Sequence, residues 1–162
     1  MPVTQTAATT VELALADRAA TRRLGARLAA LLRPGDFVGL GGVLGSGKTT
    51  LARDVIEALA GGPVEVPSPT FTLVQTYELG RLTLWHVDLY RIEAPGEVIE
   101  LGLDDALGEG VLLVEWPERL GPLLPAERLD LTLVQGPAQD ARVARLAAHG
   151  SWTARLPALA DA

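Results

Sequence analysis

The chain contains no cysteine. Disulfides, cysteine-ligated zinc and thiol catalysis are therefore excluded, and the composition fits a reducing compartment. No stretch approaches the ~20 consecutive apolar residues that cross a bilayer, and the first ten residues lack the basic and apolar regions of a secretory signal. We expect a cytoplasmic protein with no membrane partner.

Basic tracts are also missing, and the formal net charge is −6. A protein that holds nucleic acid by itself needs a basic surface, so we expect any RNA or DNA to be held by a partner. Only one of the 14 basic residues is a lysine, Lys48. The compact ammonium of a lysine suits a phosphate group better than the planar fork of an arginine does.

Length and hydrophobicity indicate one globular domain over residues 1–162, with loose ends at 1–8 and about 158–162. The 162 residues are 48% hydrophobic, which is enough for one buried core and too little chain for two. Because aromatic residues make up only 4%, the core must consist mainly of leucine, valine and alanine.

The hydrophobic pattern predicts an α/β fold with a mixed sheet. Residues 11–15 predict a strand, and Asp17 can cap a helix that extends to Leu32. The other predicted elements are a strand at 37–42, a helix at 47–60, a hairpin of 70–79 with 81–90, a helix from Pro95, strands at 110–116, 129–135 and 141–149, and a helix after Trp152.

The segment GGVLGSGKTT, residues 41–50, contains the sequence GxxxxGK[ST] between a predicted strand and a predicted helix. Glycines let backbone N–H groups turn inward around a phosphate, and a helix beginning at Lys48 adds its positive end. In this motif the residue after the lysine, here Thr49, is expected to offer its hydroxyl to Mg²⁺. The alternative, a plain glycine-rich turn, does not explain this order of strand, loop and helix.

Acidic residues lie near the ends of two of the predicted strands. Glu115 closes the apolar run VLLVE, where P-loop enzymes carry an acid near the magnesium ion; the alternative is a carboxylate simply exposed at a strand end. Asp88 belongs to HVDLYR, and strand alternation predicts His86, Asp88 and Tyr90 on one face. An acid in such an apolar strand needs a metal, a water or a hydrogen bond, whereas His86 is predicted to be structural.

Two further segments carry polar residues with a possible role. In SPTF, residues 68–71, Thr70 lies where P-loop switch proteins sense the γ-phosphate; the alternative is that Pro67 and Pro69 only stiffen a connection. The acidic residues between Glu93 and Glu109 predict the solvated face of a helix, with a docking surface as the alternative.

The sequence narrows the class of P-loop protein. Guanine recognition by NKxD is impossible because the chain has no asparagine and no second lysine. No insertion has the length of a kinase lid. The ATPase interpretation is favoured, and a small-molecule kinase and a nucleotide-gated assembly factor without net turnover remain open.

The motifs LGSGKTT, SPTFTLVQTY, HVDLYR and LVEWPERL, in this order, resemble the bacterial TsaE (YjeE) family, from about Leu13 to Gly150. That resemblance implies an α/β fold of the P-loop NTPase type, with a mixed, mainly parallel sheet flanked by helices. It further implies a small ATPase of tRNA threonylcarbamoyladenosine biosynthesis that binds ATP with Mg²⁺. It also implies weak hydrolysis until the partner proteins TsaD and TsaB are present, with tRNA reached through those partners.

The resemblance also assigns roles to individual residues. Asp88, Glu115 and Thr70 are the expected catalytic residues, with Asp88 or Thr70 orienting the water, and Ser68 accompanies Thr70 in the switch-like segment. The expected metal residues are Thr49, Glu115 and Asp88. The expected nucleotide-binding residues are Gly42, Gly45, Ser46, Gly47, Lys48, Thr49, Thr50, Trp116 and Arg142.

Two departures from the family pattern involve three positions. Val43 stands where the family loop usually has an aspartate, and Gln75 and Thr76 replace an acidic pair before the hairpin tyrosine. The first change bears on water positioning or partner contact, and the second on partner docking. Neither change removes a phosphate-binding atom.

Overall fold

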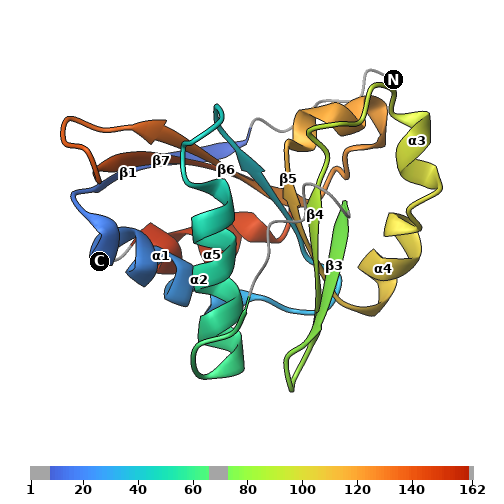
Figure 1. Ribbon diagram of the computed structural model, residues 1–162, viewed down its shortest axis with the longest axis horizontal. Coiled ribbons are helices and arrows are strands. Elements are labelled where there is room, and N and C mark those ends of the chain that lie inside the picture. The colour runs from blue at the N-terminus through green and yellow to red at the C-terminus, as the bar shows by residue number, and fades with distance from the viewer. Residues whose placement is uncertain (1–7, 66–72, 161–162) are drawn as a thin grey trace.

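The computed structural model describes residues 8–65 and 73–160, which form one seven-stranded sheet with helices on both faces (Figure 1). The elements in chain order are β1 (Thr9–Leu15), α1 (Arg18–Leu31), β2 (Phe37–Gly41), α2 (Lys48–Ala60), β3 (Val74–Glu78), β4 (Thr83–Asp88), α3 (Gly96–Ile99), α4 (Leu103–Glu109), β5 (Val111–Glu115), the 3₁₀ segment η1 (Pro117–Leu123), β6 (Arg128–Gln135), β7 (Arg142–His149) and α5 (Trp152–Ala160). No described helix has the length and apolar character needed to cross a membrane.

The strands lie in the order β1-β7-β6-β2-β5-β4-β3. β2 pairs in parallel with both β5 and β6, and β4 pairs in parallel with β5. The remaining pairs, β1 with β7, β6 with β7 and β3 with β4, are antiparallel. The predicted α/β fold with a mixed sheet is therefore confirmed, and β5 is buried along its whole length, as a central parallel strand should be.

Alternation along the strands divides the core between the two faces of the sheet. On one face Val38 and Leu40 pack with the apolar sides of α1, α2 and α5. On the other face Phe37 and Leu112 pack with α3, α4 and η1. Figure 1 shows this separation, with α3 and α4 lying away from the three longer helices.

The ends of the first two helices follow local rules. The side chain of Asp17 accepts a hydrogen bond from the backbone N–H of Ala20 at 2.8 Å and so caps α1 as predicted. Helix α2 starts after Gly47 and stops at Gly61, and both glycines have left-handed backbone angles.

Three sequence predictions need correction. The single helix expected from Pro95 is two short helices, because Gly102 has a left-handed φ of 68° between α3 and α4. The strand expected through Tyr90 ends at Asp88, whose Oδ1 accepts a hydrogen bond from the Tyr90 N–H and turns the chain. The segment after Trp116, for which no element was predicted, is the 3₁₀ segment η1.

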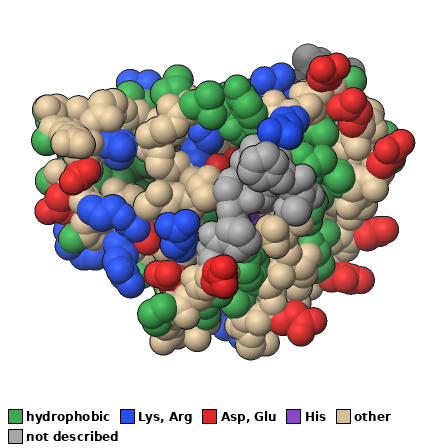
Figure 2. Space-filling view, in the orientation of Figure 1, with side chains coloured by type: hydrophobic (Ala, Val, Ile, Leu, Met, Phe, Trp, Pro, Cys, Tyr) green, Lys and Arg blue, Asp and Glu red, His purple; other side chains and the backbone are tan. Residues whose placement is uncertain are grey.

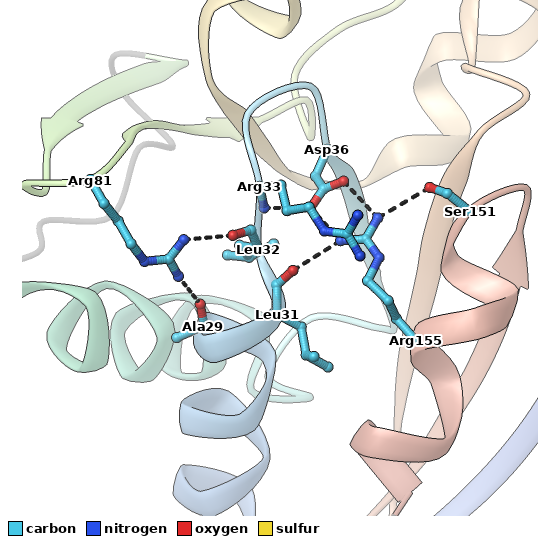
Figure 3. Close-up of polar contacts among 8 residues, drawn as sticks. All are labelled: Ala29, Leu31, Leu32, Arg33, Asp36, Arg81, Ser151 and Arg155. Atoms are coloured by element: carbon cyan, nitrogen blue, oxygen red, sulfur yellow. Dashed lines mark hydrogen bonds and ion pairs between the residues drawn. The ribbon is translucent and has the colours of Figure 1, made fainter.

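The carbonyl end of α1 is held by two arginines that are distant in the sequence (Figure 3). Arg81, beyond β3, donates to the carbonyl oxygens of Leu32 at 2.7 Å and Ala29 at 2.6 Å. Arg155 of α5 donates to the Leu31 carbonyl and forms a buried, two-pronged ion pair with Asp36 at 2.7 and 2.8 Å. These contacts satisfy carbonyl groups that a helix end leaves without partners.

Candidate functional site

The glycine loop lies between the end of β2 and the start of α2 and has the shape of a cradle. Gly42, Gly45 and Gly47 have φ values of 131°, 80° and 106°, which other residues rarely adopt. A Cβ on Gly42 would lie 2.5 Å from the Ser46 Oγ and 2.6 Å from the Leu133 carbonyl oxygen. The backbone path that the motif predicts is therefore built into the fold.

Lys48 begins α2 and is only 5% exposed. Its Nζ donates hydrogen bonds to the carbonyl oxygens of Gly42 at 2.7 Å and Val43 at 3.0 Å. The same Nζ lies 4.3 Å from the centre of the Trp116 ring, within range of a cation–π contact. Burial lowers the pKa of Lys48, and the nearby carboxylates of Glu115, Asp88 and Glu118 oppose that shift.

A chain of hydrogen bonds leads from α2 into the sheet. The Thr49 hydroxyl donates to Oε1 of Glu115 at 2.8 Å, and Oε2 of Glu115 lies 2.6 Å from Nε2 of His86. Glu115 is 2% exposed and His86 is fully buried. Both oxygens of the carboxylate are thus held, with Oε1 directed to the start of α2.

Asp88 lies directly beside Glu115, because the two residues are partners in the parallel pairing of β4 and β5. It is 4% exposed and accepts a hydrogen bond from the backbone N–H of Tyr90 at 2.9 Å. The sheet therefore places two carboxylates from adjacent strand ends next to the threonine hydroxyl of the loop. Sequence alternation predicted the shared face of His86 and Asp88 correctly.

These groups line one cleft with a volume of about 300 Å³. The lining residues are Leu44, Gly45, Gly47, Lys48, Thr49, Thr50, Asp88, Tyr90, Glu115 and Trp116. The rings of Tyr90 and Trp116 are 5.1 Å apart and form an aromatic wall. Trp116 has a φ of 60°, a strained conformation for a non-glycine residue and one that occurs often at functional sites.

Three of the predicted site residues lie behind the loop and do not line the cleft. The carbonyl of Gly42 accepts from Lys48, and Ser46 is 5% exposed, with a hydroxyl that has no hydrogen-bond partner among the described residues. Arg142 donates from Nε to the Ser46 carbonyl at 2.8 Å. Its Nη1 donates to the carbonyls of Gln139 and Ala141, which precede β7. In this geometry Arg142 braces the loop, and its contact with phosphate stays a prediction.

Two residues of the site, Tyr90 and His86, were not predicted as site residues from the sequence. Tyr90 lines the cleft because the chain turns at Asp88, and His86 belongs to the site because it contacts Glu115. The signal for His86 was its position two residues before Asp88 on the same strand face. Ser68 and Thr70 lie outside the described residues.

The residues present fit a nucleotide with Mg²⁺. No group of three His, Asp or Glu side chains with the spacing of a metal site occurs in residues 8–65 and 73–160. Mg²⁺ does not need such a cage, because it keeps several waters and takes one or two protein oxygens together with substrate phosphates. Thr49 and Glu115 offer two such oxygens beside the cradle, and the buried Ser46 hydroxyl provides a further polar group behind the loop.

Comparisons with known proteins identify one family. The family model described as threonylcarbamoyl adenosine biosynthesis protein TsaE matches residues 15–144. The protein named tRNA threonylcarbamoyladenosine biosynthesis protein TsaE in Rickettsia felis is 40% identical over 121 residues, which are 75% of this chain and 71% of that protein. The protein of the same name in Bacillus subtilis is 42% identical over 114 residues and covers 70% of each chain. The crystal structure of YdiB from Bacillus subtilis superposes with a TM-score of 0.78 at 31% identity and covers 94% of both chains.

Proposed function

This chain belongs to the TsaE family of threonylcarbamoyl adenosine biosynthesis proteins, and on that premise we propose that it is the Mg²⁺-dependent ATP-hydrolysing subunit of the tRNA-modifying complex. Its role lies in tRNA threonylcarbamoyladenosine biosynthesis. The proposal adds to that role the chemistry of ATP and the need for protein partners.

The arrangement of Lys48, Thr49 and Glu115 carries the proposal. Lys48 and the turned backbone of the loop line the cleft of about 300 Å³, and the Thr49 hydroxyl donates to the Glu115 carboxylate at its edge. In P-loop NTPases the same three kinds of group hold the β- and γ-phosphates and the metal. The aromatic pair Tyr90 and Trp116 closes one side of the cleft.

Each side chain has a defined task in hydrolysis. The ammonium of Lys48 would stabilise the negative charge of the phosphates, and two loop carbonyls already position it. Thr49 and Glu115 would hold Mg²⁺, which neutralises charge that develops between the β- and γ-phosphates. Asp88 is the described carboxylate beside them that can accept a hydrogen bond from the attacking water.

Among the described cleft residues, Asp88 is the carboxylate left to act on a water, because both oxygens of Glu115 are engaged by Thr49 and His86. A site with so few groups to activate water fits an enzyme that partners complete. We propose TsaD and TsaB as these partners, with tRNA held by them. The acidic balance of the chain, with a formal charge of −6, supports indirect contact with tRNA.

The test is Mg-ATP hydrolysis by the purified chain, alone and mixed with TsaB and TsaD of the same organism. We expect slow turnover alone and a rise of at least tenfold on mixing. Lys48→Ala is the matched control, and it should abolish both tight ATP binding and the rise. Unchanged turnover on mixing would reject the partner-activated ATPase. A phosphorylated metabolite formed without partners would instead identify a small-molecule kinase, and tight docking without turnover a nucleotide-gated assembly factor.

A further inference from the structure

A second hollow lies on the opposite side of β5 from the nucleotide cleft, between the α3–α4 pair and η1. This groove, with a volume of about 260 Å³, has Phe37 of β2 and Leu112 of β5 at its base. Ile99 of α3 and Leu123 of η1 line it while remaining 69% and 44% exposed. No residue among those described lines both the groove and the nucleotide cleft.

The exposure of Ile99 and Leu123 is costly in water. Burying apolar side chains of this size is favourable, and exposed apolar side chains gathered at the rim of a groove are typical of an interaction site. The other large exposed apolar side chains of the described residues, Val43, Leu44 and Tyr90, surround the nucleotide loop. The apolar surface of the described residues is therefore concentrated at two places, and only one of them is explained by the nucleotide.

The groove is bordered by acidic side chains only on its helical side. Residues 93–109 contain six Asp and Glu residues and no Lys or Arg. All six are exposed, and two of them, Asp104 and Asp105, line the groove itself. Figure 2 shows acidic side chains along the edge of the molecule where Figure 1 places α3 and α4.

We propose that this groove is a docking site for a basic amphipathic helix of a partner protein. Apolar side chains of that helix, spaced i, i+3 or i+4 and i+7, would fill the space between Ile99 and Leu123. Lysine or arginine side chains on its flanks would meet Asp104 and Asp105. A partner strand is not favoured here, because the edges of the sheet are β1 and β3 and neither contributes to the groove.

The proposal does not depend on nucleotide hydrolysis. The sequence alone allowed two interpretations of the acidic residues between Glu93 and Glu109, a solvated helix face or a docking surface, and the proposal selects the docking surface. Because the groove and the cleft lie apart, the chain can bind ATP and the helix at the same time. Loss of helix binding in the groove should therefore leave ATP binding in the cleft intact, and the reverse, so the two failures can be distinguished.

The test is a titration of the full-length ¹⁵N-labelled chain with a 15-residue helical peptide that has leucines at the stated spacing and lysines on its flanks. We expect amide shifts confined to residues around Ile99, Gly102, Leu107 and Leu123. The dissociation constant, measured by fluorescence anisotropy, should rise at least tenfold for Ile99→Asp and for the pair Asp104→Lys with Asp105→Lys. A peptide of the same composition with scrambled leucine spacing should bind at least tenfold more weakly.

The matched control reverses two acids elsewhere, Glu12→Lys with Asp140→Lys, which changes the net charge by the same amount. Equal weakening by this pair, or equal binding of the scrambled peptide, would overturn the proposal in favour of nonspecific charge attraction. Self-association of the chain that Ile99→Asp abolishes would overturn it in favour of a second copy as the occupant. Retained backbone spectra and ATP affinity would show that each variant is folded.

Discussion

His86 Nε2 lies 2.6 Å from Glu115 Oε2 in the fully buried part of the sheet, and the other carboxylate oxygen accepts from Thr49. Nδ1 of the ring is buried without a hydrogen-bond partner among the described residues. The tautomer with its proton on Nε2 therefore donates to the carboxylate and leaves no buried N–H without an acceptor. His86 fixes the orientation of the acid that faces the nucleotide site, so it is a positioning residue.

Replacing His86 with leucine should weaken the Mg²⁺-dependent part of nucleotide binding about tenfold, since groups that orient a metal ligand typically contribute 10- to 100-fold to metal affinity. Affinity for a fluorescent ADP analogue, measured over a series of Mg²⁺ concentrations, checks this. With the metal chelated, wild type and variant should bind alike. His86→Gln can present an N–H near the position of Nε2 and should retain most of the metal effect. Equal losses in the two variants would show that His86 serves only packing.

Gly42→Ala should destabilise the loop more than Gly45→Ala. Both glycines have positive φ, which costs a residue with a side chain about 1–2 kcal/mol. A Cβ on Gly42 would in addition meet the Ser46 hydroxyl and the Leu133 backbone, whereas nothing lies within 4 Å of a Cβ on Gly45. Urea unfolding of the two variants gives the comparison, and equal losses would mean that the loop can shift to accept the methyl group.

Arg155→Ala should lower the free energy of unfolding by about 3 kcal/mol, because it leaves the Asp36 carboxylate buried without its charged partner. It also removes the donor to the Leu31 carbonyl and the contact of the guanidinium with the Trp152 ring. Arg145→Ala is the matched control. Its ion pair with Glu12 is mostly exposed, so the loss should stay below about 0.5 kcal/mol. Chemical denaturation measures both, and similar losses would contradict the assignment.

The free energy of unfolding should fall at alkaline pH because of the phenol of Tyr77. Burial raises the pKa of its phenol above the ordinary 10.0, with Arg53 opposing the shift. The folded state then keeps its proton while the unfolded state loses it, so this contribution to stability is complete below pH 10 and is lost as pH rises through the raised pKa. Absorbance at 295 nm should show that Tyr77 ionises above its ordinary pKa of 10.0.

Tyr77→Phe supplies the control for that pH dependence. The buried hydroxyl has no hydrogen-bond partner among the described residues, so its removal should leave stability at pH 7 unchanged or raise it by up to about 1 kcal/mol. The variant should also lose part of the alkaline decline. A loss of more than about 1 kcal/mol at pH 7 would show that the hydroxyl has a partner in solution.

The sequence predicted the site wherever a local pattern fixes local geometry. The loop from Gly42 to Thr49, the cap at Asp17 and the buried strand ending at Glu115 all follow from residue types at short spacing, and the structure has them at the predicted positions. The break at Gly102 was missed because a glycine inside an apolar pattern allows a left-handed turn without requiring one.

What the sequence determined by itself is therefore the presence of a strand, a glycine loop and a helix, together with an acid near the end of each of two further strands. Only the tertiary structure decided that Thr49, Glu115 and His86 touch, because the parallel pairing of β4 with β5 and of β5 with β2 joins segments far apart in the chain. The same holds for the brace of Arg142 on the loop and the groove between α3 and η1. Contacts of this kind depend on which strand lies beside which, and that order is set by the packing of the whole core.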